Sequence, residues 1–168
     1  MQKLADTMRT ETVEHNRRID DGVFTLAANP AEKIAPPKRR PVVPPFDFAP
    51  LTNAVERLTV AARRYDARAG AAVAAGAAGP SIATANGVLL TAERALTRAD
   101  GLPRRPWFRH QIYAPGFYTG YGVKTLPAVR EAIEERDFTE AASQIPKIAS
   151  AIEAYAAEIE KAASALEK

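Results

Sequence analysis

Apolar residues, of which alanine is the commonest, recur every three or four positions over long stretches of this chain. The strongest run begins after Pro50 and comprises Leu51, Ala54, Val55, Leu58, Ala61, Ala62 and Tyr65. This spacing places them on one face of an α-helix, which we predict from Pro50 to about Ala78, where Gly79-Pro80 interrupts it. Alanine buries little area, so helices of this kind need a further surface to pack against.

Four more segments have helical character. Residues 1–20 carry a thin apolar face, and a helix over about 82–96 is predicted to close before Gly101 and Pro103. Two helices finish the chain. For the first, Thr125 is a candidate cap and Pro127 suits the opening turn. For the second, Asp137 resembles the start of a capping box, and Pro146 is predicted to kink the helix or delay its start.

Prolines are concentrated in residues 29–50. Because proline lacks a backbone donor and disfavours helix in the preceding residue, this stretch is predicted to be an extended linker. Phe46 and Phe48 are expected to anchor it. No segment alternates convincingly as a strand, so the predicted class is all-α: a four-helix bundle with an added N-terminal helix and a proline-rich linker.

Residues 102–126, here called the aromatic loop, are expected to be irregular. They hold half of the aromatic side chains of the chain together with three glycines. Loops of this length without regular structure are uncommon and often functional.

Charge and composition narrow the range of functions. The net charge is only +3, and the basic clusters Lys38-Arg39-Arg40, Arg63-Arg64 and Arg104-Arg105 lie among acidic residues. We favour a solvated surface over a nucleic-acid interface, which typically has a stripe of Lys and Arg along one element. There is no cysteine, no apolar run near the roughly 20 residues of a membrane span, and no apolar block of a signal peptide at the N-terminus.

The residue types that carry chemistry are sparse. The chain has two histidines, His15 and His110, in unlike contexts, and neither belongs to a zinc-binding motif. His110 is predicted to be a hydrogen-bonded structural residue. The Gly-rich run 116–125 is rejected as a phosphate loop because Val123 separates its last glycine from Lys124 and no strand precedes it. We therefore predict no catalytic residue, metal ligand or cofactor in this chain.

One long motif resembles a known family. It runs Gly101-Leu102-Pro103-Arg104-Arg105-Pro106-Trp107-Phe108-Arg109-His110-Gln111-Ile112-Tyr113-Ala114-Pro115. The glutamate carboxypeptidase II family has a similar run from Gly-Leu-Pro through Arg-His to Tyr-Ala-Pro. Tyr121, Leu126-Pro127 and the segment from Phe48 to Leu58 continue the likeness, which covers about residues 46–168. The chain thus resembles the transferrin receptor-like dimerisation domain of these zinc peptidases, in a bacterial homologue.

The resemblance implies an architecture. Residues 50–168 would be the dimerisation domain, residues 29–49 the crossing between domains, and residues 1–28 the terminal helix of a peptidase domain that holds the zinc. The implied partners are a second copy of the chain, that peptidase domain and a peptide substrate, with no nucleic acid. The parent would be an exported (periplasmic or extracellular) carboxypeptidase or aminopeptidase, and this chain would not be an enzyme by itself.

The resemblance also implies a substrate role for the aromatic loop. In the family, a Lys-Tyr pair in this loop reaches the pocket for the C-terminal residue of the substrate. Tyr121 matches the tyrosine, whereas Gly120 occupies the lysine position, so glutamate specificity does not carry over. Lys124 is the candidate replacement cation, which makes Tyr121 and Lys124 the expected substrate-binding residues. Tyr121 could instead simply pack the loop.

Three functions follow from these observations. The first is the dimerisation domain of a zinc metallopeptidase. The alternatives are a basic helical nucleic-acid-binding domain and a non-catalytic receptor or scaffold module like that of the transferrin receptor.

Overall fold

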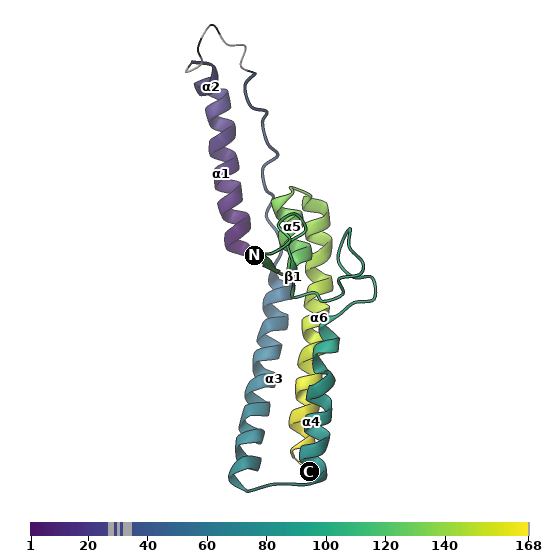
Figure 1. Ribbon diagram of the computed structural model, residues 1–168. Helices are drawn as coiled ribbons and strands as arrows, with labels where there is room; N and C mark the ends of the chain where they lie inside the picture. Colours follow the sequence, from purple (N-terminus) through teal and green to yellow (C-terminus); the bar gives the residue numbers. More distant parts are fainter. Residues whose placement is uncertain (27–28, 30, 32–34, 168) are drawn as a thin grey trace.

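The fold is described by a computed structural model that covers residues 1–26, 29, 31 and 35–167 (Figure 1). Within these residues, seven helical segments and one small hairpin follow the chain. They are α1 (Gln2–Asp20), α2 (Val23–Leu26), α3 (Ala49–Ala74), α4 (Pro80–Ala92), the 3₁₀ helix η1 (Glu93–Leu96), β1 (Tyr113–Pro115), β2 (Val123–Thr125), α5 (Pro127–Glu134) and α6 (Phe138–Ala165). The predicted all-α class is confirmed.

The last helix, α6, organises the bundle. It packs against α3, α4, η1 and α5, and Figure 1 shows α3 and α4 lying beside the half of α6 that ends at the C-terminus. Its isoleucines Ile145, Ile148 and Ile152 join Val129 and Ile133 of α5 in the main core. Farther along the bundle, a second and thinner core contains Ala61, Ala156 and Ile159. The half of the bundle formed by α3, α4 and the end of α6 therefore rests largely on small side chains.

Helix α3 has the predicted face but ends earlier than predicted. Leu51, Ala54 and Ala61 are buried, while Val55 on the edge of the stripe is half exposed. The helix stops at Ala74 because Gly76 adopts a positive φ of 63°, so the expected extension to Ala78 is wrong. At its start, the carboxylate of Asp47 accepts a hydrogen bond from the Ala49 amide at 2.9 Å.

Helices α5 and α6 begin differently from each other. Leu126, in the left-handed conformation at φ 48°, precedes α5, so Thr125 is not its cap. Asp137 caps α6 as predicted, since its carboxylate accepts from the Glu140 amide at 2.9 Å. Pro146 lies inside α6 and does not delay its start. The burial of α6 against several neighbours outweighs the single backbone hydrogen bond that the proline removes.

Helix α1 packs on the linker of its own chain. Figure 1 shows the extended residues 35–48 running beside it, as predicted for the proline-rich segment. Asn16 exchanges two hydrogen bonds with the backbone of Arg40, at 2.8 and 2.9 Å, and Arg9 donates to the carbonyls of Val43 and Pro44. The predicted boundary between the terminal helix (residues 1–28) and the linker (residues 29–49) involves residue 28, which lies outside the described residues, as does Pro30. This domain boundary therefore stays a prediction.

The aromatic loop contains a regular feature that sequence patterns missed. Strands β1 and β2 pair antiparallel, with Tyr113 opposite Thr125 and Pro115 opposite Val123. Three-residue strands are too short to show alternation, which explains why the loop was expected to be irregular. Among the described residues, no helix is both long and apolar enough to cross a membrane.

Candidate functional site

The aromatic loop starts at a backbone position that only glycine fits. Gly101 has φ 64°, and a Cβ atom built on it would lie 2.2 Å from the carbonyl oxygen of Pro106. This close approach lets the Leu102 amide donate to the Phe108 carbonyl at 2.8 Å. A tight turn over residues 102–108 results, and it directs the side chain of Arg105 inward.

Arg105 forms a buried ion pair with Glu131 of α5. Their side chains are only 3% and 7% exposed, and one guanidinium nitrogen lies 2.8 and 2.7 Å from the two carboxylate oxygens. Buried charges are retained when they are paired and hydrogen-bonded in this way. The prediction that the Arg104-Arg105 cluster is a solvated surface is therefore wrong for Arg105.

Further contacts extend this pair into the loop. The other terminal nitrogen of Arg105 donates to the carbonyl of Pro115, and Glu131 accepts from the Phe117 amide at 2.9 Å. The guanidinium also lies 5.5 Å from the ring centre of Phe108 and 5.7 Å from that of Phe117. We call Arg105 and Glu131 the loop clamp, because together they hold the loop on both sides of Gly116.

Residues 116–122 form the loop tip beyond the clamp. The Gly116 amide donates to the Gly122 carbonyl at 2.8 Å, and the Gly120 amide donates to the Gly116 carbonyl at 3.0 Å. Gly120 has φ 66°, as this turn requires. Tyr121 is fully exposed at the tip, so the ring does not pack the loop.

Lys124, the other predicted substrate-binding residue, lies in a different environment. Its ammonium is largely buried and bonded to Glu134 of α5, which also accepts from Arg130 at 3.0 Å. Burial acts to raise the pKa of Glu134, but the hydrogen bonds from Lys124 and Arg130 hold it below its usual value. No hydrogen bond or ion pair within the described residues joins Tyr121 to Lys124, so the structure does not gather them into one cluster.

His110 has a structural environment, as predicted. Its Nδ1 accepts from the amides of Ile112 and Tyr113, both at 3.3 Å, and its ring stacks on Tyr113 at 4.0 Å between centres. The Tyr113 hydroxyl donates to Glu93 at 2.9 Å, and this hydrogen bond to a carboxylate raises the pKa of Tyr113. Nowhere in the described ranges do three or more His, Cys, Asp or Glu side chains gather in a way that could hold a metal ion.

Sequence reasoning missed the loop clamp, although one signal pointed to it. Glu131 lies between Ala128 and Ala132, within the apolar face of its helix. An acidic residue at such a position requires a buried cationic partner. The sequence does not identify that partner, because the chain has several arginines. In the structure the turn after Gly101 brings Arg105 to Glu131.

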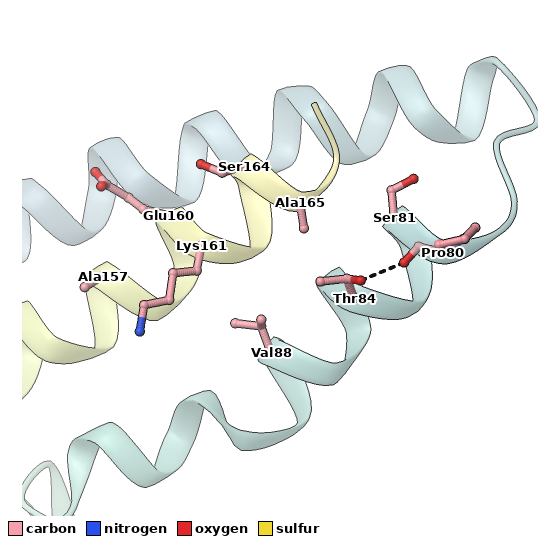
Figure 2. Close-up of a pocket in the computed structure, with 9 residues that line it drawn as sticks. All are labelled: Pro80, Ser81, Thr84, Val88, Ala157, Glu160, Lys161, Ser164 and Ala165. Atoms are coloured by element: carbon pink, nitrogen blue, oxygen red, sulfur yellow. Dashed lines mark hydrogen bonds between the residues drawn. The ribbon is translucent and has the colours of Figure 1, made fainter. Parts of the chain in front are cut away.

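A second feature lies at the other end of the bundle. An open groove of about 730 Å³ lies between α4 and α6. Figure 2 shows the residues that line it: Pro80, Ser81, Thr84, Val88, Ala157, Glu160, Lys161, Ser164 and Ala165. Large apolar side chains of α4 and of the neighbouring α3 are exposed to solvent: Leu90 of α4 is 85% exposed and Val73 of α3 is 80% exposed. This half of the molecule thus presents apolar surface without a defined polar site.

Each basic cluster has an arginine at the surface that pairs with a carboxylate. Arg39 pairs with Asp20, Arg64 with Glu167 at 2.9 Å, and Arg104 with Glu140 at 2.8 Å. Such pairing disfavours a nucleic-acid interface, in which phosphates would take the place of these carboxylates.

Comparison with known proteins agrees with the architecture. Residues 46–160 match the family model described as the transferrin receptor-like dimerisation domain. A protein of Arabidopsis thaliana named as a probable glutamate carboxypeptidase is 39% identical over 89 residues, which are 53% of this chain and 12% of that protein. A probable glutamate carboxypeptidase of Arthroderma benhamiae is 39% identical over 59 residues, 35% of this chain and 8% of that protein. The chain therefore corresponds to a small part of these relatives.

Proposed function

The chain belongs to the transferrin receptor-like dimerisation domain family, and from this premise we propose that it dimerises a glutamate carboxypeptidase II-like zinc metallopeptidase. The module would join two copies of the parent protein. The family resemblance expected from the aromatic loop is thereby confirmed, while the activity of the parent is part of the proposal.

The observation that carries the proposal is the exposed apolar surface of α3 and α4. Val60, Val73 and Leu90 point to solvent on helices whose own core is thin. Exposed apolar side chains that come together on a surface mark interaction sites, and in homo-oligomers a two-fold axis makes one such surface serve both partners. Burial of these side chains in a second copy would supply the area that the alanine-rich core lacks.

Sedimentation velocity of the 168-residue chain at micromolar concentration tests this proposal. We expect a dimer that dissociates on dilution as a single equilibrium. A monomer throughout the micromolar range would contradict it.

The catalytic groups of the parent are proposed to lie in a separate peptidase domain that holds zinc. The two relatives are named as carboxypeptidases and are much longer than this chain, which supports that division. Helix α1 would be the terminal helix of the peptidase domain. Its exposed Val13 and the neighbouring Leu26, which is almost fully exposed, would then be covered by that domain.

We also propose that the loop tip supplies one wall of the substrate pocket. Tyr121 would contact the C-terminal residue of a peptide, and Lys124 would exchange Glu134 for the substrate carboxylate. The full exposure of Tyr121 supports this, because an exposed aromatic ring on an ordered turn is available for a ligand.

Steady-state kinetics of the parent protein tests the pocket. Tyr121→Phe is expected to raise KM for the preferred peptide with little change in kcat, since a binding contact is lost. Tyr118→Phe, at a second exposed tyrosine of the tip, is the matched control. Equal kinetics for the wild type and Tyr121→Phe would remove Tyr121 from the pocket.

A receptor or scaffold role is the remaining alternative. It predicts the same dimer but a parent without peptidase activity. Assay of the parent with zinc and a peptide series separates the two.

A further inference from the structure

We propose that Arg105, held by Glu131, is a positioning residue that fixes the loop tip and thereby the place of Tyr121. The structural part of this inference concerns the chain alone. Its kinetic part rests on the proposed function of the loop.

The loop clamp acts at the two ends of the tip's first turn. Arg105 binds the carbonyl of Pro115, and Glu131 binds the amide of Phe117 at 2.9 Å. Gly116 lies between these points and makes both hydrogen bonds that close the tip. The direction in which the tip leaves the hairpin is therefore set by Glu131, which lies on α5, and by Arg105, which is bound to it.

Tyr121 depends on this backbone anchor because no side chain of the described residues holds its ring. The side chain is fully exposed, and no aromatic contact or side-chain hydrogen bond of Tyr121 occurs among the described residues. Its backbone amide donates to Thr119 at 2.7 Å, which ties it only to its own turn. A shift of the turn would carry the tyrosine with it.

The clamp needs an arginine. One nitrogen of the guanidinium meets both oxygens of Glu131, another reaches Pro115, and the plane faces Phe108 and Phe117. The compact ammonium of lysine cannot make these contacts together. Arg105→Lys therefore keeps the charge but should release the tip.

Hydrogen exchange of the 168-residue chain is the first test. In Arg105→Lys and in Glu131→Gln we expect the Phe117 amide to exchange at least ~10-fold faster, with unchanged protection in α3 and α6. Arg109→Lys is the matched control, because this exposed arginine of the same loop has no side-chain hydrogen bond or ion pair to any described residue. Unchanged Phe117 exchange in Arg105→Lys would overturn the proposal. So would lost α6 protection in both variants, since the pair would then support the whole fold.

A double-mutant cycle in the parent protein is the second test. If Arg105 acts through Tyr121, Arg105→Lys and Tyr121→Phe should each raise KM, with kcat within ~3-fold, and the double variant should be no worse than the poorer single variant. Multiplicative effects on KM would show that Arg105 does not act through Tyr121. If Tyr121→Phe alone has no effect, the pocket proposal fails, while the exchange experiment still decides whether the clamp holds the tip.

Discussion

Gly101 and Gly70 lack a side chain with opposite consequences for the stability of the fold. Gly101 has a positive φ and lies against the backbone of Pro106, whereas Gly70 in α3 has open space where a Cβ would be. The first glycine is required by the aromatic loop. The second lowers the stability of a helix, because glycine in a helix interior costs conformational entropy.

Alanine at these two positions should have opposite effects. Gly101→Ala is expected to destabilise the chain by about 2 kcal/mol or more, through backbone strain and overlap with Pro106. Gly70→Ala should stabilise it by about 0.5–1 kcal/mol. Urea unfolding followed by circular dichroism measures both. Equal stability of the two variants would refute the strain assigned to Gly101.

Glu134 should give the hairpin a pH dependence. Its pKa is below the ordinary value of 4.5 in the folded chain, because the hydrogen bonds of Lys124 and Arg130 outweigh burial. A carboxyl group of this kind contributes stability above its unfolded pKa, and the contribution is lost as the pH falls through the lower folded pKa. Glu134→Gln should therefore unfold with a flatter pH dependence below about pH 4.5.

The urea midpoint between pH 6 and pH 3 checks this expectation. Glu56→Gln is the control, because the exposed Glu56 side chain forms no ion pair in the part of the chain that the structure describes. Parallel pH profiles for wild type and Glu134→Gln would show that the Lys124–Glu134 pair contributes nothing.

At the scale of elements, the contact between α1 and the linker depends on Asn16. Its amide satisfies both the carbonyl and the N–H of Arg40, and Asn16 is buried. Asn16→Ala would leave two backbone groups of the linker without these partners, at a cost of about 1–3 kcal/mol. We expect faster proteolysis of residues 35–48 with α3 and α6 intact.

Asn53→Ala is the matched control for that experiment. Asn53 is exposed on α3, and its side chain makes no hydrogen bond to the described residues. Equal cleavage rates in the Asn16 and Asn53 variants would mean that other contacts of α1, among them the hydrogen bonds of Arg9 to the linker, are enough to hold it.

The elements also differ in how far sequence patterns could predict them. The faces of α3 and α6 and the cap at Asp137 followed from spacing and residue type, because those signals are local. The hairpin was missed because its strands are short. It was also missed because the loop is held by the loop clamp, whose Glu131 lies on α5, and such a contact between distant residues leaves no local sequence signal. Thr125 was a reasonable cap by residue type, but the left-handed Leu126 took the position before α5.

For the whole molecule, self-association should depend on the exposed apolar side chains of α3 and α4. Leu90→Glu is expected to weaken the proposed dimer by about 100-fold or more, because a charge buried without a partner at an interface is costly. Sedimentation equilibrium measures the change, and circular dichroism should show an intact helical fold.

Ser143→Glu adds the same charge to an exposed position of α6 and should leave association unchanged. A Leu90→Glu chain that dimerises like the wild type would place the interface elsewhere.

Sequence alone determined the helical class, the extended linker and the family, because each follows from short-range spacing or from an ordered motif. It also indicated that the alanine-rich helices need a further surface. The family resemblance pointed to Tyr121, with Lys124 as a replacement cation, as the substrate-binding residues, and that assignment remains a prediction.

Only the tertiary structure decided which charges are buried. Arg104 and Arg105 are adjacent and of the same type, yet one is bound to exposed carboxylates and the other lies in the loop clamp. The physical reason is that burial depends on how the turn at Gly101 directs each side chain toward α5. The same reason separates Tyr121, exposed on the tip, from Lys124, which α5 binds through Glu134.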